Sequence, residues 1–150
     1  MAQQIYELLQ KDHDTVKMMI DKILETTDGA EKTREDLFAK IKHELEVHTK
    51  FEEEVFYPTF REDKPDKEAK EEVKDALNEH DEAKSMLAKL EKMDKTSDEF
   101  IQTLRELQKA LEHHISDEED EMFPQARDAV DDDAAVEMAE RYKEMKKKAH

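Results

Sequence analysis

Apolar residues recur at intervals of three, four or seven positions along most of the chain, and this spacing limits the possible folds more than any other feature. The clearest series are Ile5, Leu9, Val16 and Ile20, and Leu104, Leu107, Leu111 and Ile115. Residues three or four apart share one face of an α-helix, so each series predicts a helix with one buried face. Only one Gly and three Pro occur in 150 residues, so the helices can be long. We expect an all-α fold.

The residues between these series predict where helices begin and end. Gly29 should follow the first helix, Pro58 should end or kink the second, and Ser97 should cap the start of the fourth. Helices are expected at about residues 2–28, 31–60, 65–93, 97–128 and 132–147. Because the connections are short, neighbours should be antiparallel, which gives an up-down-up-down four-helix bundle with a short fifth C-terminal helix. One domain is expected over residues 1–150, with the bundle at about 2–128 and the additional helix at about 132–147.

The formal charge of −17 argues against several classes of partner. An acidic surface repels phosphate backbones and anionic lipids, and the one basic cluster, Lys146 to Lys148, lies near the C-terminus, so no nucleic-acid or membrane partner is expected. The absence of Cys excludes thiolate chemistry, so any metal must have nitrogen and oxygen ligands. No apolar run has the length of a signal peptide or a membrane span, which predicts a cytoplasmic protein.

Histidine and glutamate occur on the predicted core faces in a pattern that repeats once. HTKFEEEVFYP at 48–58 aligns with HISDEEDEMFP at 114–124 at an offset of 66, and each begins with His-x-x-x-Glu. A lone His in KDHDTVK and another in NEHDEAK match at an offset of 67. Each of these side chains shares a helix face with core leucines. The pattern gives six candidate metal ligands: His13, His48, Glu52, His80, His114 and Glu118.

Metal binding explains these six residues better than a core held together by hydrogen bonds alone. One His on an apolar face is more often an ordinary core residue, but four at repeat-related positions would require several coincidences. Two buried carboxylates are costly to ionise without a cation. Imidazoles and carboxylates suit first-row transition ions, and each carboxylate can bridge two ions. We expect two metals, one served by each helix pair, and no catalytic residue separate from the metal site.

Other polar and flexible residues are expected to lie outside the site. Three further histidines are turned off the core stripe or terminal: His43, His113 and His150. A solvated acidic face should include Glu53, Glu54, Glu119, Asp120 and Glu121, although Glu121, three residues after Glu118, could reach the edge of the site. Core filler should include Met18, Met19, Met86, Met93 and Met122.

The sequence resembles the hemerythrin-like, or HHE cation-binding, family from about residue 5 to about residue 125. The segments that carry the resemblance are LLQKDHDTVKMMI, HTKFEEEVFYP, NEHDEAKSML and HHISDEEDEMFP. They have the order His, His-x-x-x-Glu, His, His-x-x-x-Glu that is typical of this family. The resemblance implies two iron ions, oxo- or hydroxo-bridged and held by carboxylates, and a small-molecule ligand: peroxide, dioxygen or nitric oxide.

One departure from the oxygen-carrying members of the family bears on function. Those members resemble this chain but add a fifth His one helical turn from the lone His of the third helix, where this sequence has Ala76 and Lys84. Both irons would then remain open, which favours peroxide decomposition or defence against oxidative or nitrosative stress. The alternative is a dioxygen or iron binding, sensing or storage protein without turnover. Tyr6 or Tyr57 could supply a seventh ligand and restore saturation, but both are interpreted as packing aromatics.

A ferritin-like oxidase is a third interpretation, and the spacing argues against it. That architecture uses Glu-x-x-His on two helices. The residues three positions before the four candidate histidines are Gln10, Leu45, Leu77 and Leu111. None of them is Glu, so this class is rejected.

Overall fold

The computed structural model describes residues 2–149 and shows the predicted all-α fold. Two long rods each join an α-helix, a π-helical turn and a shorter α-helix. They are α2 (Glu31–Phe51), η1 (Glu52–Phe56) and α3 (Tyr57–Asp63), and α5 (Asp98–Asp117), η2 (Glu118–Met122) and α6 (Phe123–Ala129). The other helices are α1 (Ile5–Leu24), α4 (Lys67–Lys92) and α7 (Asp132–Ala149).

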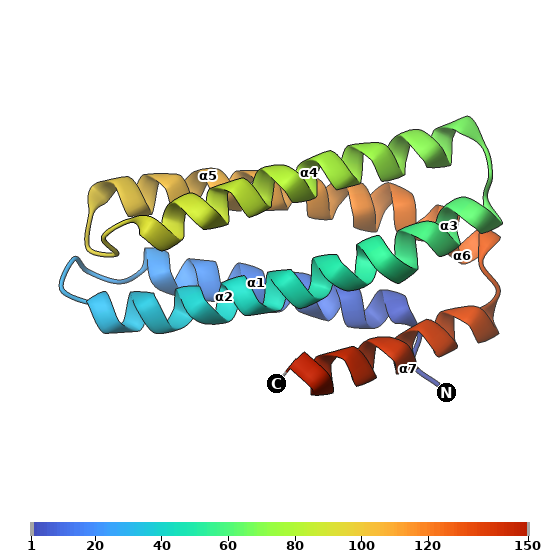
Figure 1. Ribbon diagram of the computed structural model, residues 1–150, viewed down its shortest axis with the longest axis horizontal. Coiled ribbons are helices and arrows are strands. Elements are labelled where there is room, and N and C mark those ends of the chain that lie inside the picture. The colour runs from blue at the N-terminus through green and yellow to red at the C-terminus, as the bar shows by residue number, and fades with distance from the viewer. Residues whose placement is uncertain (1, 150) are drawn as a thin grey trace.

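The helices form two antiparallel pairs that pack into one bundle (Figure 1). Helix α1 packs against α2, α4 packs against α5, and α1 also contacts α5. After α6 the chain turns back, and α7 lies along α1 and α2. Within the described part of the chain, no helix is both long enough and apolar enough to cross a membrane.

Side-chain caps explain where several helices begin and end. Ser97 Oγ accepts a hydrogen bond from the Phe100 N–H (3.1 Å), which confirms the predicted cap of α5. Helix α1 ends at Leu24, earlier than expected, because the Thr26 hydroxyl donates a hydrogen bond to the Ile23 carbonyl (2.5 Å). The buried Arg34 then donates to Thr26 Oγ1 (2.8 Å) and to the Lys95 carbonyl (2.7 Å). These bonds tie the α1–α2 turn to the α4–α5 loop.

The two π-helical turns follow directly after the candidate ligands Glu52 and Glu118. In each turn, a backbone N–H bonds to the carbonyl five residues earlier, from Tyr57 to Glu52 and from Phe123 to Glu118. The second helix does not end at Pro58, because the helical backbone continues to Asp63, but a π-helical turn interrupts its α-helical bonding just before Pro58. Pro58 falls in the first turn of α3, where its missing N–H is tolerated.

The apolar core consists of two clusters separated by a polar band. One cluster includes Leu9, Phe51 and Ala76, and the other includes Val16, Leu45 and Ala83. Each candidate histidine therefore lies along its helix between residues of different clusters. Of the methionines expected in the core, Met19 and Met122 are buried and Met86 and Met93 pack partly against it, but Met18 is half exposed, so that prediction is wrong for Met18.

Candidate metal centre

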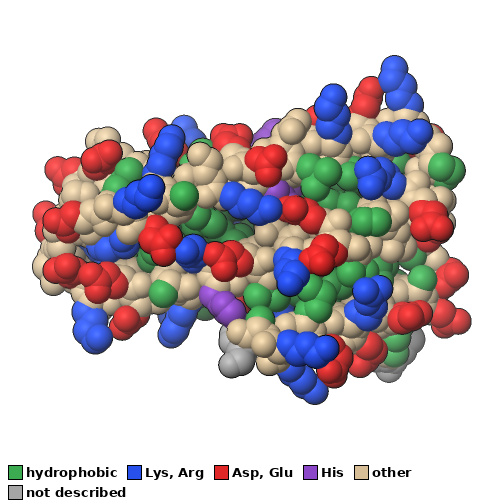
Figure 2. All heavy atoms as spheres, in the orientation of Figure 1, with side chains coloured by type: hydrophobic (Ala, Val, Ile, Leu, Met, Phe, Trp, Pro, Cys, Tyr) green, Lys and Arg blue, Asp and Glu red, His purple; other side chains and the backbone are tan. Residues whose placement is uncertain are grey.

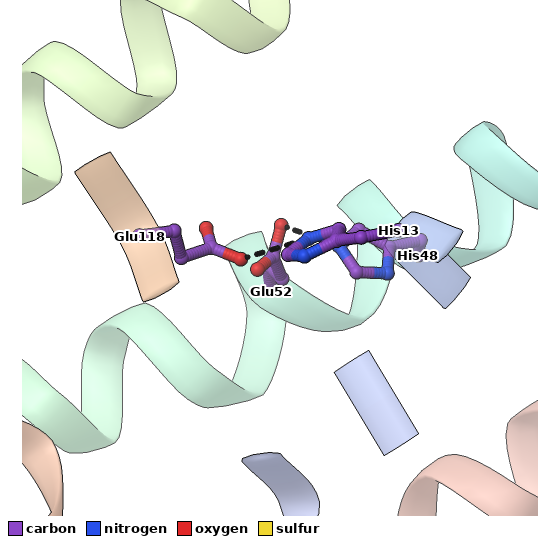
Figure 3. Close-up of side chains that lie close together, drawn as sticks. All are labelled: His13, His48, Glu52 and Glu118. Carbon is purple, nitrogen blue, oxygen red and sulfur yellow. Dashed lines mark ion pairs between the residues drawn. The ribbon is translucent and has the colours of Figure 1, made fainter. Parts of the chain in front are cut away.

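Four imidazoles and two carboxylates meet in the polar band between the two apolar clusters. The histidines His13, His48, His80 and His114 come one each from α1, α2, α4 and α5, whereas Glu52 and Glu118 begin η1 and η2. All six are at most 7% exposed. Figure 3 shows His13, His48, Glu52 and Glu118 pointing toward one another. The structure thus brings together every residue of the predicted ligand set.

Each carboxylate faces one histidine from each helix pair. Glu118 Oε1 lies 3.3 Å from His13 Nε2, and Glu118 Oε2 lies 3.3 Å from His114 Nε2. Glu52 Oε1 lies 3.1 Å from His48 Nε2 and 3.2 Å from His80 Nε2. The ring centroids of His13 and His48 are 4.9 Å apart, and those of His80 and His114 are also 4.9 Å apart. This arrangement suits carboxylates that bridge two cations.

The donor atoms fit two cations that share two ligands. One set contains His13, His48, Glu52 and Glu118, the other contains Glu52, His80, His114 and Glu118, and within each set the donor atoms lie within 4.8 Å of one another. Several buried donors have no hydrogen-bond partner: His13 Nε2, His48 Nε2, Glu52 Oε2, His114 Nε2 and Glu118 Oε1. Buried polar atoms are normally satisfied, so atoms left this way indicate a ligand. The residues present therefore fit a metal, and the ligand role of each one stays a prediction.

Each candidate histidine also contacts one further carboxylate through Nδ1, the outer ring nitrogen that points away from the cluster. The Nδ1 atoms of His13, His48, His80 and His114 lie 2.6, 3.0, 2.8 and 2.8 Å from Glu119, Asp12, Glu53 and Glu79, respectively. Such a contact selects the ring orientation that presents Nε2 to the metal. Each contact also joins two different helices, and together they form a closed ring around the bundle.

Two of these carboxylates, Glu53 and Glu119, do not lie on the solvated acidic face that the sequence predicts for them. Each follows a ligand glutamate directly, whereas Asp12 and Glu79 each precede a ligand histidine. The same offsets of 66 and 67 that relate the ligands also relate these pairs. All four share that recurrence, although Glu54 and Asp120 recur at the same offset of 66.

Tyr57 does not behave as the simple packing aromatic that the sequence predicts. Its hydroxyl donates to Glu118 Oε2 (2.7 Å) and lies 3.3 Å from Glu52 Oε1 and 3.1 Å from His80 Nε2. The π turn explains this position, because in η1 the residue at i+5, not i+4, returns to the face of Glu52. In η2 the equivalent residue is Phe123, whose ring stacks on His13 with centroids 6.3 Å apart.

Tyr6 lies away from the six candidate ligands. Its ring packs against Phe56 and Phe123, and the Arg127 guanidinium lies 4.8 Å from the ring centroid. Its buried hydroxyl has no hydrogen-bond partner. The ring contacts of Tyr6 agree with the predicted packing role.

The other histidines stand apart from the two ligand sets. His43 is half-buried and belongs to neither set, and His113 is 70% exposed, with its Nε2 3.2 Å from Asp117. Both positions agree with the sequence-based interpretation. His150 lies outside the described residues. Glu121 is exposed but lines a cavity with Glu118 and His114, so it does reach the edge of the site.

Two small cavities reach the ligands from different sides. One, of about 40 Å³, touches all four histidines and is otherwise lined mainly by apolar side chains, among them Val16, Ala83 and Leu87. The second, of about 60 Å³, lies between α4 and the α5–η2 rod and is lined by several carboxylates together with Ala76. Each is large enough for a few water-sized molecules and too small for a bulky substrate.

In the metal-free protein, the buried charges hold one another in ionised form. Burial alone would lower the pKa of His48, but the Glu52 and Asp12 carboxylates outweigh it and raise the pKa to about 10. The pKa values of His13 and His114 are also raised, because Glu118 with Glu119 or Glu79 outweighs burial. Burial opposes ionisation of Asp12, yet its hydrogen bond from His48 lowers the pKa to about 2. Metal binding must therefore displace protons from the histidines.

Comparison with known proteins agrees with this geometry. A sequence model of the hemerythrin HHE cation binding domain matches residues 4–126. The chain therefore belongs to the hemerythrin HHE cation-binding family, and its buried His and Glu cluster fits a metal-binding site.

Individual relatives are similar to this chain over different lengths. An uncharacterised hemerythrin-like protein of Schizosaccharomyces pombe is 34% identical over 69% of this chain and 51% of its own length. A DNA nickase of Nostoc sp. is 25% identical over 96% of this chain and 39% of its own length. The chain thus spans about half or less of these curated relatives. The crystal structure of a hemerythrin HHE cation binding domain-containing protein of Mycobacterium kansasii shares the fold, with a TM-score of 0.82 over 98% of this chain and 88% of that one, at 23% identity.

Exchanging single histidines should separate ligands from surface residues. His48→Ala and His114→Ala should each lose iron, because both rings are buried and offer Nε2 to the cluster. His43→Ala and His113→Ala should keep wild-type iron content, since neither residue belongs to the two buried sets. Metal analysis of the four purified variants measures this. Equal losses in both groups would mean that the wrong residues have been assigned to the site.

The stability difference between metal-bound and metal-free protein should widen as the pH rises. In the metal-free protein the pKa of His48 is raised, so its contribution is complete below the unfolded value of about 6.5 and is lost as the pH rises toward about 10. Metal-bound histidines are already deprotonated and lack this loss. Melting temperatures at pH 6 and pH 9 test this, with His48→Gln flattening the slope of the metal-free protein. A difference that shrinks with rising pH would contradict it.

Proposed function

We propose that the chain holds two iron ions and decomposes hydrogen peroxide at them. The single observation that carries this proposal is that Glu52 and Glu118 each face a histidine from both helix pairs, so that two ligand sets share two carboxylates. His13 and His48 would hold one ion, and His80 and His114 the other. Nitrogen and carboxylate ligands in this ratio suit iron, and family membership supports the choice.

The residues that replace the fifth histidine of the oxygen carriers support turnover over oxygen carriage. Ala76 is buried beside His114 and Glu118 but has no ligand atom. Lys84 has a half-exposed side chain, and its Nζ binds Glu53 (3.0 Å) instead of reaching the cluster. Neither residue can saturate an ion, so positions for an external ligand stay open.

The polar groups around the site can hold and move protons. In the metal-free protein, burial reinforced by Glu118 and Glu52 raises the pKa of Tyr57 well above its usual value, and its hydroxyl donates a hydrogen bond to Glu118. Glu53, Glu79 and Glu119 connect the outer ring nitrogens to positions that are 22–28% exposed. When bound, iron would pass two electrons from one peroxide, which is oxidised to dioxygen with loss of two protons, to a second peroxide, which takes up two protons and is reduced to two waters. The chain's own groups would return and remove the protons.

The surface and cavities further define what can react. The reaction must be with a small molecule, because the cavities that touch the ligands have volumes of only about 40 and 60 Å³. The DNA nicking of the Nostoc relative is not carried over to this chain. Acidic and basic side chains alternate over the face shown in Figure 2, with no basic stripe on that face, and the formal charge is −17.

Iron content and peroxide consumption test the proposal together. We expect two iron ions per chain and steady oxygen release from added peroxide over many turnovers, with His114→Ala losing both properties. Metal analysis and an oxygen electrode measure them. One metal per chain would contradict the two-ion site. Two irons with untouched peroxide and a stable, reversible oxygen adduct would favour dioxygen binding or sensing without turnover.

Restoring a histidine at position 76 should slow peroxide consumption. Ala76 lies one helical turn before His80 and is buried beside the site, so Ala76→His can bring an imidazole to the ions and occupy an open position. We expect a slowing of about tenfold, the lower end of the change in activity that altered surroundings of a metal ligand cause. Lys84→His tests the position one turn after His80, because Lys84 lines the cavity that touches the four histidines and binds Glu53. Equal rates in wild type and Ala76→His would contradict the open-site argument.

A further inference from the structure

The four carboxylates that hold the histidine rings are not equivalent. Asp12 is 5% exposed, whereas Glu79, Glu119 and Glu53 are 22%, 26% and 28% exposed. The repeat pairs Asp12 with Glu79, so the difference arises between matching positions of the two halves. What buries Asp12 is α7, a helix that packs on α1 and α2, the two long helices of the first half.

Two side chains of α7 hold Asp12 beside its contact with His48. The Tyr142 hydroxyl donates to Asp12 Oδ2, and Lys146 Nζ lies 2.5 Å from Asp12 Oδ1. Asp12 Oδ2 is also the acceptor for His48 Nδ1 at 3.0 Å. One carboxylate thus receives three donors from two neighbouring elements, which leaves it little freedom to turn.

The rings around this contact are also packed in place. Tyr142 is fully buried, its ring lies 4.6 Å from that of Phe51 and 6.4 Å from that of His48 between centroids, and Lys146 Nζ lies 4.7 Å from the Tyr142 centroid. Phe51 precedes the ligand Glu52 in the chain. Helix α7 therefore contacts two residues next to members of the first ligand set: Asp12, which holds His48, and Phe51, which precedes Glu52.

We propose that Tyr142 and Lys146 are positioning residues that act through Asp12 on His48, so that α7 makes the His13–His48 ion site the tighter of the two. The inference rests on the proposed two-ion site. Partners of a metal-bound histidine that fix its ring typically change metal affinity by about ten- to a hundredfold when removed. Among the described residues, the second site is held less firmly: Glu79 is held by His114 and His113, and Glu53 by His80 and the half-exposed Lys84, with no donor from a separate covering helix.

The test uses Co²⁺ as a spectroscopic probe, titrated into metal-free full-length protein. Wild type should bind two equivalents. Tyr142→Phe and Lys146→Met should each weaken one equivalent by about tenfold or more and shift its visible absorption, leaving the other unchanged. Glu79→Ala should weaken the other equivalent, so that combining it with Tyr142→Phe weakens both. Co²⁺ affinity and absorption report on coordination and do not require activity.

Matched controls separate positioning from loss of packing. Tyr6→Phe removes a buried hydroxyl that has no hydrogen-bond partner, and Lys147→Met removes the same charge as Lys146→Met from an exposed site. Both should bind Co²⁺ as wild type does. In an Asp12→Ala background, Tyr142→Phe should still lower the melting temperature but should no longer change the cobalt signature.

Three outcomes would overturn the inference. Tyr142→Phe and Lys146→Met could lower only the melting temperature, with both affinities and spectra at wild-type values, in which case α7 merely packs against the bundle. The two variants could instead weaken both equivalents alike, in which case α7 does not distinguish the sites. If wild type binds fewer than two Co²⁺, the two-ion proposal itself fails, and that result is visible before any variant is compared.

Discussion

The cost of burying charge in the middle of the bundle determines most of the local structure around the site. Two glutamates and four histidines would be unstable in an apolar core unless each polar atom found a partner or a cation. Each outer ring nitrogen, Nδ1, contacts a carboxylate from a neighbouring helix. The inner nitrogens, Nε2, and the glutamate oxygens cluster in two donor sets. The apolar clusters on either side shield this band from bulk water, which strengthens the electrostatic interactions inside it.

Much of this arrangement could be predicted from the sequence because it follows ordinary helical periodicity. His48 and Glu52 are four residues apart, as are His114 and Glu118, and that interval places both members of a pair on one helix face. Because the same His and Glu positions recur in both halves of the chain, the pattern of candidate ligands does not arise by coincidence. Short connections implied antiparallel neighbours, so the four polar faces had to meet, and the structure places them together.

The parts that could not be predicted lie where the periodicity changes or where contacts come from remote segments. A π turn shifts the face by one residue, so Tyr57 reaches the cluster where α-helical counting would have pointed to Phe56. Asp12 meets Tyr142 and Lys146 across more than a hundred positions of sequence, and no local pattern indicates that pairing. Glu53 and Glu119 belonged to runs of acidic residues, in which one bonded carboxylate looks like its solvated neighbours.

The sharing of carboxylates between the two halves has a consequence for how such a centre can arise. Each ion would take both of its imidazoles from one hairpin but needs a carboxylate from each, so a single hairpin offers an incomplete donor set. Two identical hairpins related by a two-fold axis would, however, complete both sets at once, since the donors of one half match those of the other in kind and order. A symmetric pair of short chains is therefore a sufficient ancestor for this bundle. Duplication and fusion would then have freed the halves to diverge, and a helix appended to one side would be enough to make two formerly equivalent ions distinct.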